Sequence, residues 1–359
     1  MVEVTKTYLP NPKKYYEYIE ESFQSRIVTN NGPLVNLLEK RLVNYLNVKN
    51  LILVSNGTLA LQIAYKVLGL EKEIVTTPFT FNATAGSILW QGLSPIFADI
   101  DNLSFNISSD EIEKKINKNT SAIVPVHIFG NACKVNEIDA IAKKYGLRVV
   151  YDAAHAFGVD YKGQSLLNYG DISILSFHAT KLFHTIEGGA IITNDSNTAK
   201  KIRSMINFGY SSPFNSTING INAKMSEFHA AMGLAVLDDI EYILKQRKDI
   251  WLRYISEIKA PIRFQKINNN ANCNYHYFPV VFDSEKELLV IEKSLLKNGI
   301  RPRRYFYPSL DVLDYFNIYG RQNCHNSRDL SLRLLCLPIF PDMNEDIQSK
   351  IIKIINNAL

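Results

Sequence analysis

Short apolar runs alternate with helix-like segments between about residues 35 and 240. Helical spacing of three and four occurs between most of the runs, as in Ala60, Ile63, Ala64 and Val67. Because parallel strands need long crossovers, repeated strand–helix–strand units predict a mostly parallel central sheet flanked by helices. The runs are rich in Val and Ile, as in strands buried on both faces, and they predict strands at Leu51–Ser55, Ile74–Thr77, Pro95–Ile100, Ala122–Ile128, Arg148–Asp152, Ile172–Phe177 and Ala190–Thr193.

The pattern changes after about residue 240. A long helical stretch is predicted from Ser226 to about Arg247, and it could link two domains. We expect an α/β protein with a large domain at residues 1–240 and a smaller C-terminal α+β domain at residues 241–359. The elements expected in the smaller domain include an Asn-rich surface loop at Ile267–Asn274, a strand at Tyr275–Phe282 and a helix at Glu285–Lys297.

Composition restricts the class of protein. Of 359 residues, 46% are apolar and 11% aromatic, so the chain can bury a large core. The net charge of +5 is spread over the whole length and does not indicate a nucleic-acid partner. No apolar run reaches the roughly 20 residues of a membrane span, and no signal-peptide core is present. We expect a soluble, cytoplasmic protein with no membrane partner and, since its four cysteines form no C-x-x-C pair, no metal site.

Polar residues follow several predicted strands, at the carboxyl ends where ligands bind in open α/β sheets. The first such segment is Ser55-Asn56-Gly57-Thr58, between a strand and a helix. Gly57 allows a tight turn, and the free N–H groups of the following helix can bind an anion. An ordinary helix cap would have the same residues. Taken alone, the segment therefore does not establish a phosphate site.

Asp152 and Lys181 each follow a different buried strand. A carboxylate in such a position must be paired, and a cationic ring nitrogen of a cofactor is one partner. A lysine in a buried loop has a lowered pKa and can act as an amine nucleophile. Simpler interpretations exist for both, since Asp152 could cap a turn and Lys181 could extend into solvent.

Together these three signals fit pyridoxal 5′-phosphate. The cofactor needs a phosphate site at a helix N-terminus, an acid against its pyridinium nitrogen and a lysine that binds it covalently. Asp152 and Lys181 are 29 residues apart, so one strand–turn unit separates two neighbouring strand ends. The acid keeps the ring protonated, and a protonated ring can accept electrons from a substrate carbanion.

A series of longer motifs occurs in order along nearly the whole chain. They are Thr29-Asn30-Asn31-Gly32-Pro33, Ser55-Asn56-Gly57-Thr58-Leu59-Ala60, Thr77-Pro78-Phe79-Thr80-Phe81-Asn82-Ala83-Thr84, Asp152-Ala153-Ala154-His155-Ala156-Phe157-Gly158, Ser176-Phe177-His178-Ala179-Thr180-Lys181, Glu187-Gly188-Gly189-Ala190, Gly220-Ile221-Asn222 with Met225-Ser226-Glu227, and Leu337-Pro338-Ile339-Phe340-Pro341. This series resembles the DegT/DnrJ/EryC1/StrS family of pyridoxal-phosphate-dependent nucleotide-sugar aminotransferases. The resemblance implies a fold-type-I aminotransferase that is active as a homodimer.

The resemblance also implies roles for single residues. Lys181 would bind the cofactor covalently and transfer protons between cofactor and substrate, and Asp152 would hold the pyridinium nitrogen. The family supplies Asn222 to the cofactor phosphate from the other subunit, so the active sites would be shared. The remaining cofactor contacts would be Phe81 and Ala154 on the two ring faces, His155 near the ring hydroxyl, and Gly57, Thr58 and Ser176 at the phosphate.

The reaction and substrate are implied in the same way. Lys181 favours transamination, because related sugar 3-dehydratases have His at this position. The residues around Lys181 and Glu187 resemble the corresponding segments of family members that act at sugar carbon 4. The segment Arg301–Pro308 resembles the corresponding segment of enzymes that convert dTDP-4-keto-6-deoxyglucose to dTDP-4-amino-4,6-dideoxyglucose. Lys224 stands where the family often has Arg, and the expected substrate-binding residues are Asn30, His178, Lys224, Arg303, Tyr305 and Tyr307.

We therefore expect a ping-pong transaminase that uses L-glutamate, releases 2-oxoglutarate and aminates the dTDP-linked 4-keto sugar, for O-antigen or another surface glycan. One alternative is a 3-aminotransferase acting on a dTDP-3-keto-6-deoxyhexose. A more distant alternative is a regulatory protein that binds the cofactor without turnover. A Rossmann dehydrogenase is not favoured, because no G-x-G-x-x-G follows the first strand.

Overall fold

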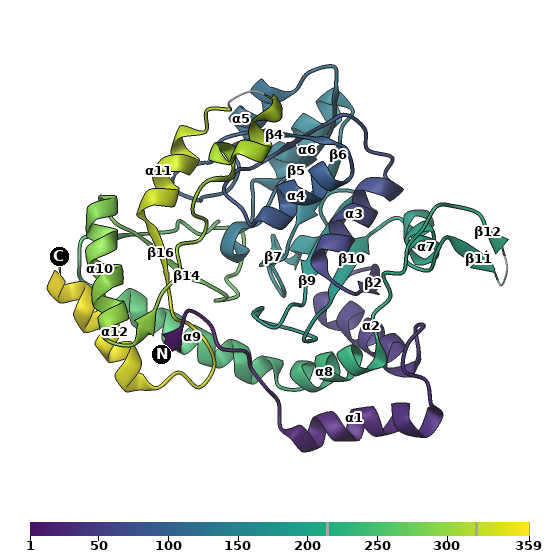
Figure 1. Cartoon of the computed structure of the whole chain (residues 1–359), viewed down its shortest axis with the longest axis horizontal. Coiled ribbons are helices and arrows are strands. Elements are labelled where there is room, and N and C mark those ends of the chain that lie inside the picture. The colour runs from purple at the N-terminus through teal and green to yellow at the C-terminus, as the bar shows by residue number, and fades with distance from the viewer. Residues whose placement is uncertain (213–214, 320–321, 359) are drawn as a thin grey trace.

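A seven-stranded sheet with helices on both faces dominates the computed structural model of the chain (Figure 1). The structure describes residues 1–212, 215–319 and 322–358. Strand β10 runs antiparallel to both of its neighbours, whereas the other pairs are parallel, so the predicted mostly parallel α/β sheet is confirmed. The strand order is β2 (Asn50–Val54), β10 (Gly189–Thr193), β9 (Ile172–Ser176), β6 (Arg148–Asp152), β5 (Thr120–Val124), β3 (Glu73–Thr76) and β4 (Ser94–Phe97).

Each of the seven predicted strands is present, but two end more than one residue earlier than expected. Strand β4 ends at Phe97 and β5 ends at Val124. Beyond β5 the chain enters a short 3-10 turn at Ile128–Gly130. The apolar residues after each strand lie in loops but are still buried. Because they are apolar like the strand before them, the sequence predicted strands that were too long.

Apolar side chains cover both faces of the sheet, which explains why its strands are almost continuously apolar. Leu53, Val75 and Ile123 point to one face, and Ile52, Ile74 and Val124 to the other. The first face is packed by α2 (Pro33–Leu46), α5 (Ser109–Lys115), α6 (Val135–Tyr145) and α8 (Glu227–Leu237). The second is packed by α3 (Gly57–Val67), α4 (Asn82–Trp90) and α7 (Ser196–Met205).

A smaller antiparallel sheet lies toward the C-terminal end of the chain (Figure 1). It consists of β13 (Arg263–Phe264), β14 (Phe278–Val281) and β16 (Leu334–Leu337). An apolar cluster of its own connects this sheet to α9 (Ile240–Glu257), α10 (Glu285–Lys297) and α12 (Glu345–Ala358), while α11 (His325–Arg333) packs on a neighbouring cluster. Helix α10 has the predicted bounds. The domain boundary at residue 240 stays a prediction.

The N-terminal segment contacts both parts of the chain. Strand β1 (Val2–Glu3) pairs with β15 (Ile300–Arg301), and α1 (Pro12–Ser25) packs on α8. The four cysteines are free thiols, and three of them are buried. Within the described ranges, none of the helices combines the length and apolar character needed to cross a lipid bilayer.

The long helical stretch predicted from Ser226 to about Arg247 is helical, but it is divided into two helices. Helix α8 ends at Leu237, and α9 begins at Ile240 and runs to Glu257. The two residues between them form ion pairs with other segments, Asp238 with Arg41 at 2.8 Å and Asp239 with Lys14 at 2.7 Å. Since these partners come from the N-terminal helices, the break could not be predicted from the local sequence.

The Asn-rich segment Ile267–Asn274 contains no helix or strand, as expected, but it is not entirely at the surface. Asn274 is buried, and its amide nitrogen donates hydrogen bonds to the carbonyl oxygens of His155 at 2.8 Å and Phe157 at 3.1 Å. The strand predicted at Tyr275–Phe282 is shorter than expected and consists only of β14 (Phe278–Val281). The chain before it runs into the interior at Asn274 and does not pair with the sheet.

Glu227 fixes α2 against α8. Its side chain is fully buried, and its carboxylate accepts hydrogen bonds from the backbone N–H groups of Leu34 at 2.7 Å and Val35 at 3.1 Å. Those first-turn amides have no acceptor within their own helix, and the helix dipole favours a negative charge beside them.

We expect Glu227→Ala to lower the free energy of unfolding by about 3 kcal/mol, because it leaves two buried donors unpaired. Glu227→Gln keeps one acceptor oxygen and should lose about half as much. Denaturant unfolding followed by circular dichroism measures both variants. An unchanged unfolding midpoint for Glu227→Ala would show that these bonds do not stabilise the fold.

Candidate active site

A cavity of about 340 Å³ opens at the carboxyl ends of β6 and β9, beside the N-termini of α3 and α4. The C-terminal part of the chain contributes Tyr277, Arg303, Tyr305 and Phe306 to its wall. Most of the predicted site residues meet here, although they come from segments far apart in the sequence. They are Gly57, Thr58, Phe81, Asp152, Ala154, His155, Ser176, His178, Lys181, Arg303 and Tyr305.

Four predicted residues do not line this cavity. Tyr307 lies in an adjoining groove that shares Phe81, Arg303 and Tyr305 with the cavity. Asn30 is exposed in the segment before α2. Asn222 and Lys224 lie together in the segment before α8, where the Lys224 ammonium donates to Oδ1 of Asn222 at 2.8 Å. One chain alone therefore does not bring Asn30, Asn222 or Lys224 to its own cavity.

Asp152 ends β6 and is buried in the floor of the cavity. Its Oδ2 accepts a hydrogen bond from the Thr84 hydroxyl at 2.8 Å, and its Oδ1 accepts one from the Ala154 N–H at 3.1 Å. Burial raises the pKa of the Asp152 carboxyl, while these bonds and the charge of Lys181 act in the opposite direction. Asp152 is thus an oriented buried acid that a cationic partner would keep ionised.

Thr84 was not among the predicted site residues. It occupies the first turn of α4, and its backbone N–H bonds to the carbonyl oxygen of Phe81. Two signals were available: Thr84 ends the motif that contains Phe81, and it lies one helical turn after Phe81, which puts both side chains on the same side of the helix.

Lys181 lies half-buried in the loop between β9 and β10. Its backbone N–H donates to the carbonyl oxygen of His178 at 2.8 Å, which fixes the turn that carries it. Burial lowers the pKa of the Lys181 amine to about 8, opposed by the charge of Asp152 and assisted by that of Arg303. About a tenth of this amine is therefore neutral, and so nucleophilic, at pH 7, far more than for an ordinary lysine.

The N-terminus of α3 provides an anion site next to Lys181. Asn56 caps the helix by accepting a hydrogen bond from the Leu59 N–H at 2.8 Å, while the earlier N–H groups of Gly57 and Thr58 have no acceptor within the helix. A Cβ atom on Gly57 would lie 3.0 Å from the Cβ of Ser176, so glycine permits the close approach of α3 to β9. The helix dipole adds to the attraction for a phosphate group.

His155 is buried at the side of the cavity, with its ring parallel to those of Phe129 and Phe306 at centroid distances of 6.2 and 6.1 Å. Its Nδ1 accepts a hydrogen bond from the Phe129 N–H at 3.3 Å. Burial, followed by the charges of Lys181 and His276, lowers the pKa of His155 well below its usual value. The ring is therefore neutral, with its proton on Nε2.

These observations fit pyridoxal phosphate. The cavity holds an exposed aromatic face on Phe81, the buried acid Asp152 and the anion-binding turn at Gly57. Lys181 supplies an amine with a lowered pKa. The low pKa favours the neutral form, which is the form that reacts with an aldehyde.

Tyr277 and Phe306 also line the cavity, and Phe129 packs against His155. No local motif marks Phe129 or Tyr277, whereas Phe306 stands between the predicted residues Tyr305 and Tyr307 and was missed although its segment had been singled out.

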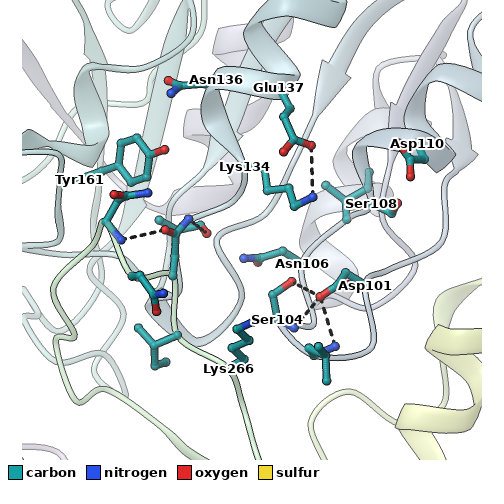
Figure 2. A pocket seen from close by; sticks show the side chains of 17 residues that line it. Asp101, Ser104, Asn106, Ser108, Asp110, Lys134, Asn136, Glu137, Tyr161 and Lys266 are labelled. Carbon is teal, nitrogen blue, oxygen red and sulfur yellow. Dashed lines mark hydrogen bonds and ion pairs between the residues drawn. The ribbon is translucent and has the colours of Figure 1, made fainter.

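A larger cavity, of about 480 Å³, lies between residues 101–110, 132–137 and 266–270 (Figure 2). Three of its charged groups already have partners within the cavity wall. Oδ1 of Asp101 accepts hydrogen bonds from the N–H and hydroxyl of Ser104, and Lys134 pairs with Glu137 at 3.3 Å (Figure 2). No lysine beside a buried acid lines it among the described residues. We therefore assign the chemistry to the smaller cavity.

The pKa of Lys181 predicts how cofactor attachment depends on pH. The neutral amine reacts, so the rate at which the apoprotein takes up pyridoxal phosphate should rise with pH and level off above about 8. Arg303→Ala should move the midpoint upward, because the Arg303 charge lowers this pKa. Arg304→Ala is the matched control, since Arg304 pairs with Glu285 at 2.8 Å. Stopped-flow absorbance measures the rate, and a wild-type midpoint near 10 would contradict the assignment.

The fold and the site together define a pyridoxal-phosphate-dependent aminotransferase. Residues 12–356 match the model of the DegT/DnrJ/EryC1/StrS aminotransferase family, and the chain belongs to this family. Its relatives include the dTDP-4-amino-4,6-dideoxy-D-glucose transaminases of Shigella dysenteriae and Escherichia coli. The first is 41% identical over 98% of this chain and 97% of the relative, and the second is 39% identical over 99% and 98%. The predicted family and cofactor are confirmed.

Solved structures of the family have the same fold. DesI, crystallised in the presence of its TDP-sugar product, matches with a TM-score of 0.92 and 30% identity over 98% of this chain and 91% of its own. Helicobacter pylori PseC, an aminotransferase involved in the biosynthesis of pseudaminic acid, matches with a TM-score of 0.90 and 26% identity over 98% of both chains.

Proposed function

We propose that the protein converts dTDP-4-keto-6-deoxy-D-glucose to dTDP-4-amino-4,6-dideoxy-D-glucose, with L-glutamate as the amino donor. The observation that carries this proposal is the cavity in which Lys181, Asp152 and the N-terminus of α3 converge. The substrate is supported by the two relatives of about 40% identity that bear this product in their names and match almost the full chain.

Bound pyridoxal phosphate would supply an electron sink for a carbanion at the substrate carbon that carries nitrogen. Asp152 would keep the ring nitrogen protonated, and Thr84 would orient Asp152 for this task. The amine of Lys181, once released from the cofactor, would remove and return the proton at the reacting carbon. Gly57, Thr58 and Ser176 would hold the phosphate, whereas Phe81 and Ala154 would contact the ring faces.

Arg303 and Tyr305 would bind the nucleotide sugar at the entrance of the cavity. The Arg303 guanidinium lies 4.4 Å from the centre of the Tyr305 ring, so a cation and an aromatic face are presented together. Such a pair suits the diphosphate and the base of a nucleotide. Tyr307 would extend this surface along the adjoining groove.

We also propose a homodimer in which each chain completes the site of the other. Asn222 and Lys224 lie outside their own cavity but present polar side chains suited to phosphate, and this placement supports a role in the partner's site. Asn30 lies outside in the same way. Sedimentation velocity tests the dimer. We further propose that the enzyme works in the cytoplasm and that its product enters O-antigen or another surface glycan.

The experiment that tests the function is a product analysis. Purified enzyme with pyridoxal phosphate and glutamate is incubated separately with the 4-keto and the 3-keto dTDP-6-deoxyhexose, and the products are examined by NMR. We expect nitrogen at carbon 4, equimolar 2-oxoglutarate and little reaction with the 3-keto sugar. Nitrogen at carbon 3 would favour the alternative aminotransferase. Cofactor binding without turnover of either sugar would favour a regulatory protein.

A further inference from the structure

Glu187 is a carboxylate on the cavity wall that the chemistry at the cofactor does not use. Asp152 and Glu187 are the acidic side chains among the described residues that line the cavity. Asp152 is buried and accepts two hydrogen bonds, whereas about half of the Glu187 side chain is exposed. The two acids thus have different surroundings and are suited to different tasks.

The backbone around Glu187 is closely packed. The Thr185 hydroxyl donates a hydrogen bond to the Glu187 carbonyl oxygen at 2.8 Å, and the Phe177 N–H donates to the Gly188 carbonyl oxygen at 2.8 Å. A Cβ atom on Gly188 would lie only 2.0 Å from the Thr185 hydroxyl oxygen, so this position requires glycine. The place of Glu187 on the cavity wall is therefore fixed by its neighbours.

His178 faces the Glu187 carboxylate from the same loop. Its Nδ1 accepts a hydrogen bond from the Thr180 N–H at 3.3 Å and lies 2.8 Å from the Thr180 hydroxyl, so the proton of a neutral ring is on Nε2. That Nε2 lies 3.6 Å from Oε1 of Glu187, which is too far for a direct hydrogen bond. The imidazole thus faces the carboxylate and leaves its oxygens free to accept other hydrogen bonds, in the cavity that Lys181 also lines.

We propose that Glu187, which faces His178, positions the hexose of the nucleotide sugar by accepting hydrogen bonds from hydroxyl groups next to the reacting carbon. The proposal rests on the proposed function. An ionised carboxylate only accepts hydrogen bonds and has room for several, which suits neighbouring hydroxyl groups. Its charge repels the carboxylates of the amino donor, which suit the Arg303 guanidinium instead. Glu187 is thus a positioning residue for one of the two substrates.

Measuring the two half-reactions separately distinguishes a role of Glu187 in sugar binding from a general effect on catalysis. Absorbance changes of the holoenzyme follow the reaction with glutamate and the reaction with the keto sugar independently. We expect Glu187→Ala to lower kcat/KM for the sugar by about 10- to 100-fold, the value of one or two hydrogen bonds to a charged group. The reaction with glutamate should change less than about threefold. Glu257→Ala is the control, because Glu257 is similarly exposed, pairs with Arg253 at 2.8 Å and does not line the cavity.

Binding without turnover provides a second readout. Calorimetry with dTDP-4-amino-4,6-dideoxyglucose and with dTDP should show that Glu187→Ala loses about tenfold affinity for the amino sugar nucleotide and none for dTDP. Equal loss for both ligands, or equal slowing of both half-reactions, would overturn the proposal. A wild-type enzyme that does not aminate the sugar would overturn the proposed function itself. An active wild type with an unaffected Glu187→Ala variant would overturn this proposal alone.

Discussion

Replacing Lys181 by alanine is expected to lower transaminase activity by about 10⁴-fold or more, because one amine both holds the cofactor and transfers the proton. The side chain lies in the cavity beside Asp152, and its lowered pKa of about 8 suits both tasks. The α3 N-terminus and Asp152 remain in the variant, so it should still bind pyridoxal phosphate without a covalent bond. Steady-state assays with glutamate and the keto sugar measure the loss.

Lys245→Ala is the control for this variant. Lys245 is an exposed lysine on α9 that pairs with Asp249 at 2.7 Å, outside the cavity. Its replacement should leave the activity unchanged. If Lys181→Ala kept more than about a hundredth of the wild-type rate, another group would have to transfer the proton.

Asp152→Asn is expected to lower the activity by about 10²- to 10³-fold, because a neutral amide cannot stabilise the positive charge on the ring nitrogen. The substitution keeps the size of the side chain, and its oxygen can still accept the hydrogen bond from Ala154. The protein should therefore remain folded and bind the cofactor, but proton removal should be slow in rapid-mixing experiments with glutamate.

Thr84→Val removes the hydroxyl that orients Asp152 without removing the charge. It should have a smaller effect, about tenfold, since one hydrogen bond to a charged group is lost. A normal rate for Asp152→Asn would mean that the carboxylate does not interact with the ring nitrogen. An equally severe loss in Thr84→Val would instead indicate that the orientation of the acid, and not its charge, limits the rate.

The large sheet could be predicted because its strands are covered on both faces and are therefore apolar along their whole length. Strand β6 has the predicted bounds, and the other six differ by a few residues. The break between α8 and α9 could not be predicted, because Asp238 and Asp239 bind residues of the distant N-terminal helices. The inward course of Asn274 depends in the same way on carbonyl groups more than a hundred residues away.

The candidate site could be predicted where one short segment carries the chemistry. Asp152 ends a strand, Lys181 lies in the loop after the next strand of the sheet, and Gly57 begins a helix, so the local pattern marks all three. Tyr277 comes from the C-terminal part of the chain and carries no local signal, whereas Phe306 stands between the predicted residues Tyr305 and Tyr307. Some residues, such as Asn222, would complete the active site of the other subunit. Only the resemblance to the family suggested this role for them.

Labelling of the cofactor lysine tests the central claim most directly. The holoenzyme is reduced with borohydride, digested and analysed by mass spectrometry for peptides that carry the reduced cofactor. We predict a single labelled peptide with the modification on Lys181, and no label in Lys181→Ala prepared in the same way. A label on a different lysine, or a wild-type protein that retains no cofactor, would contradict the account.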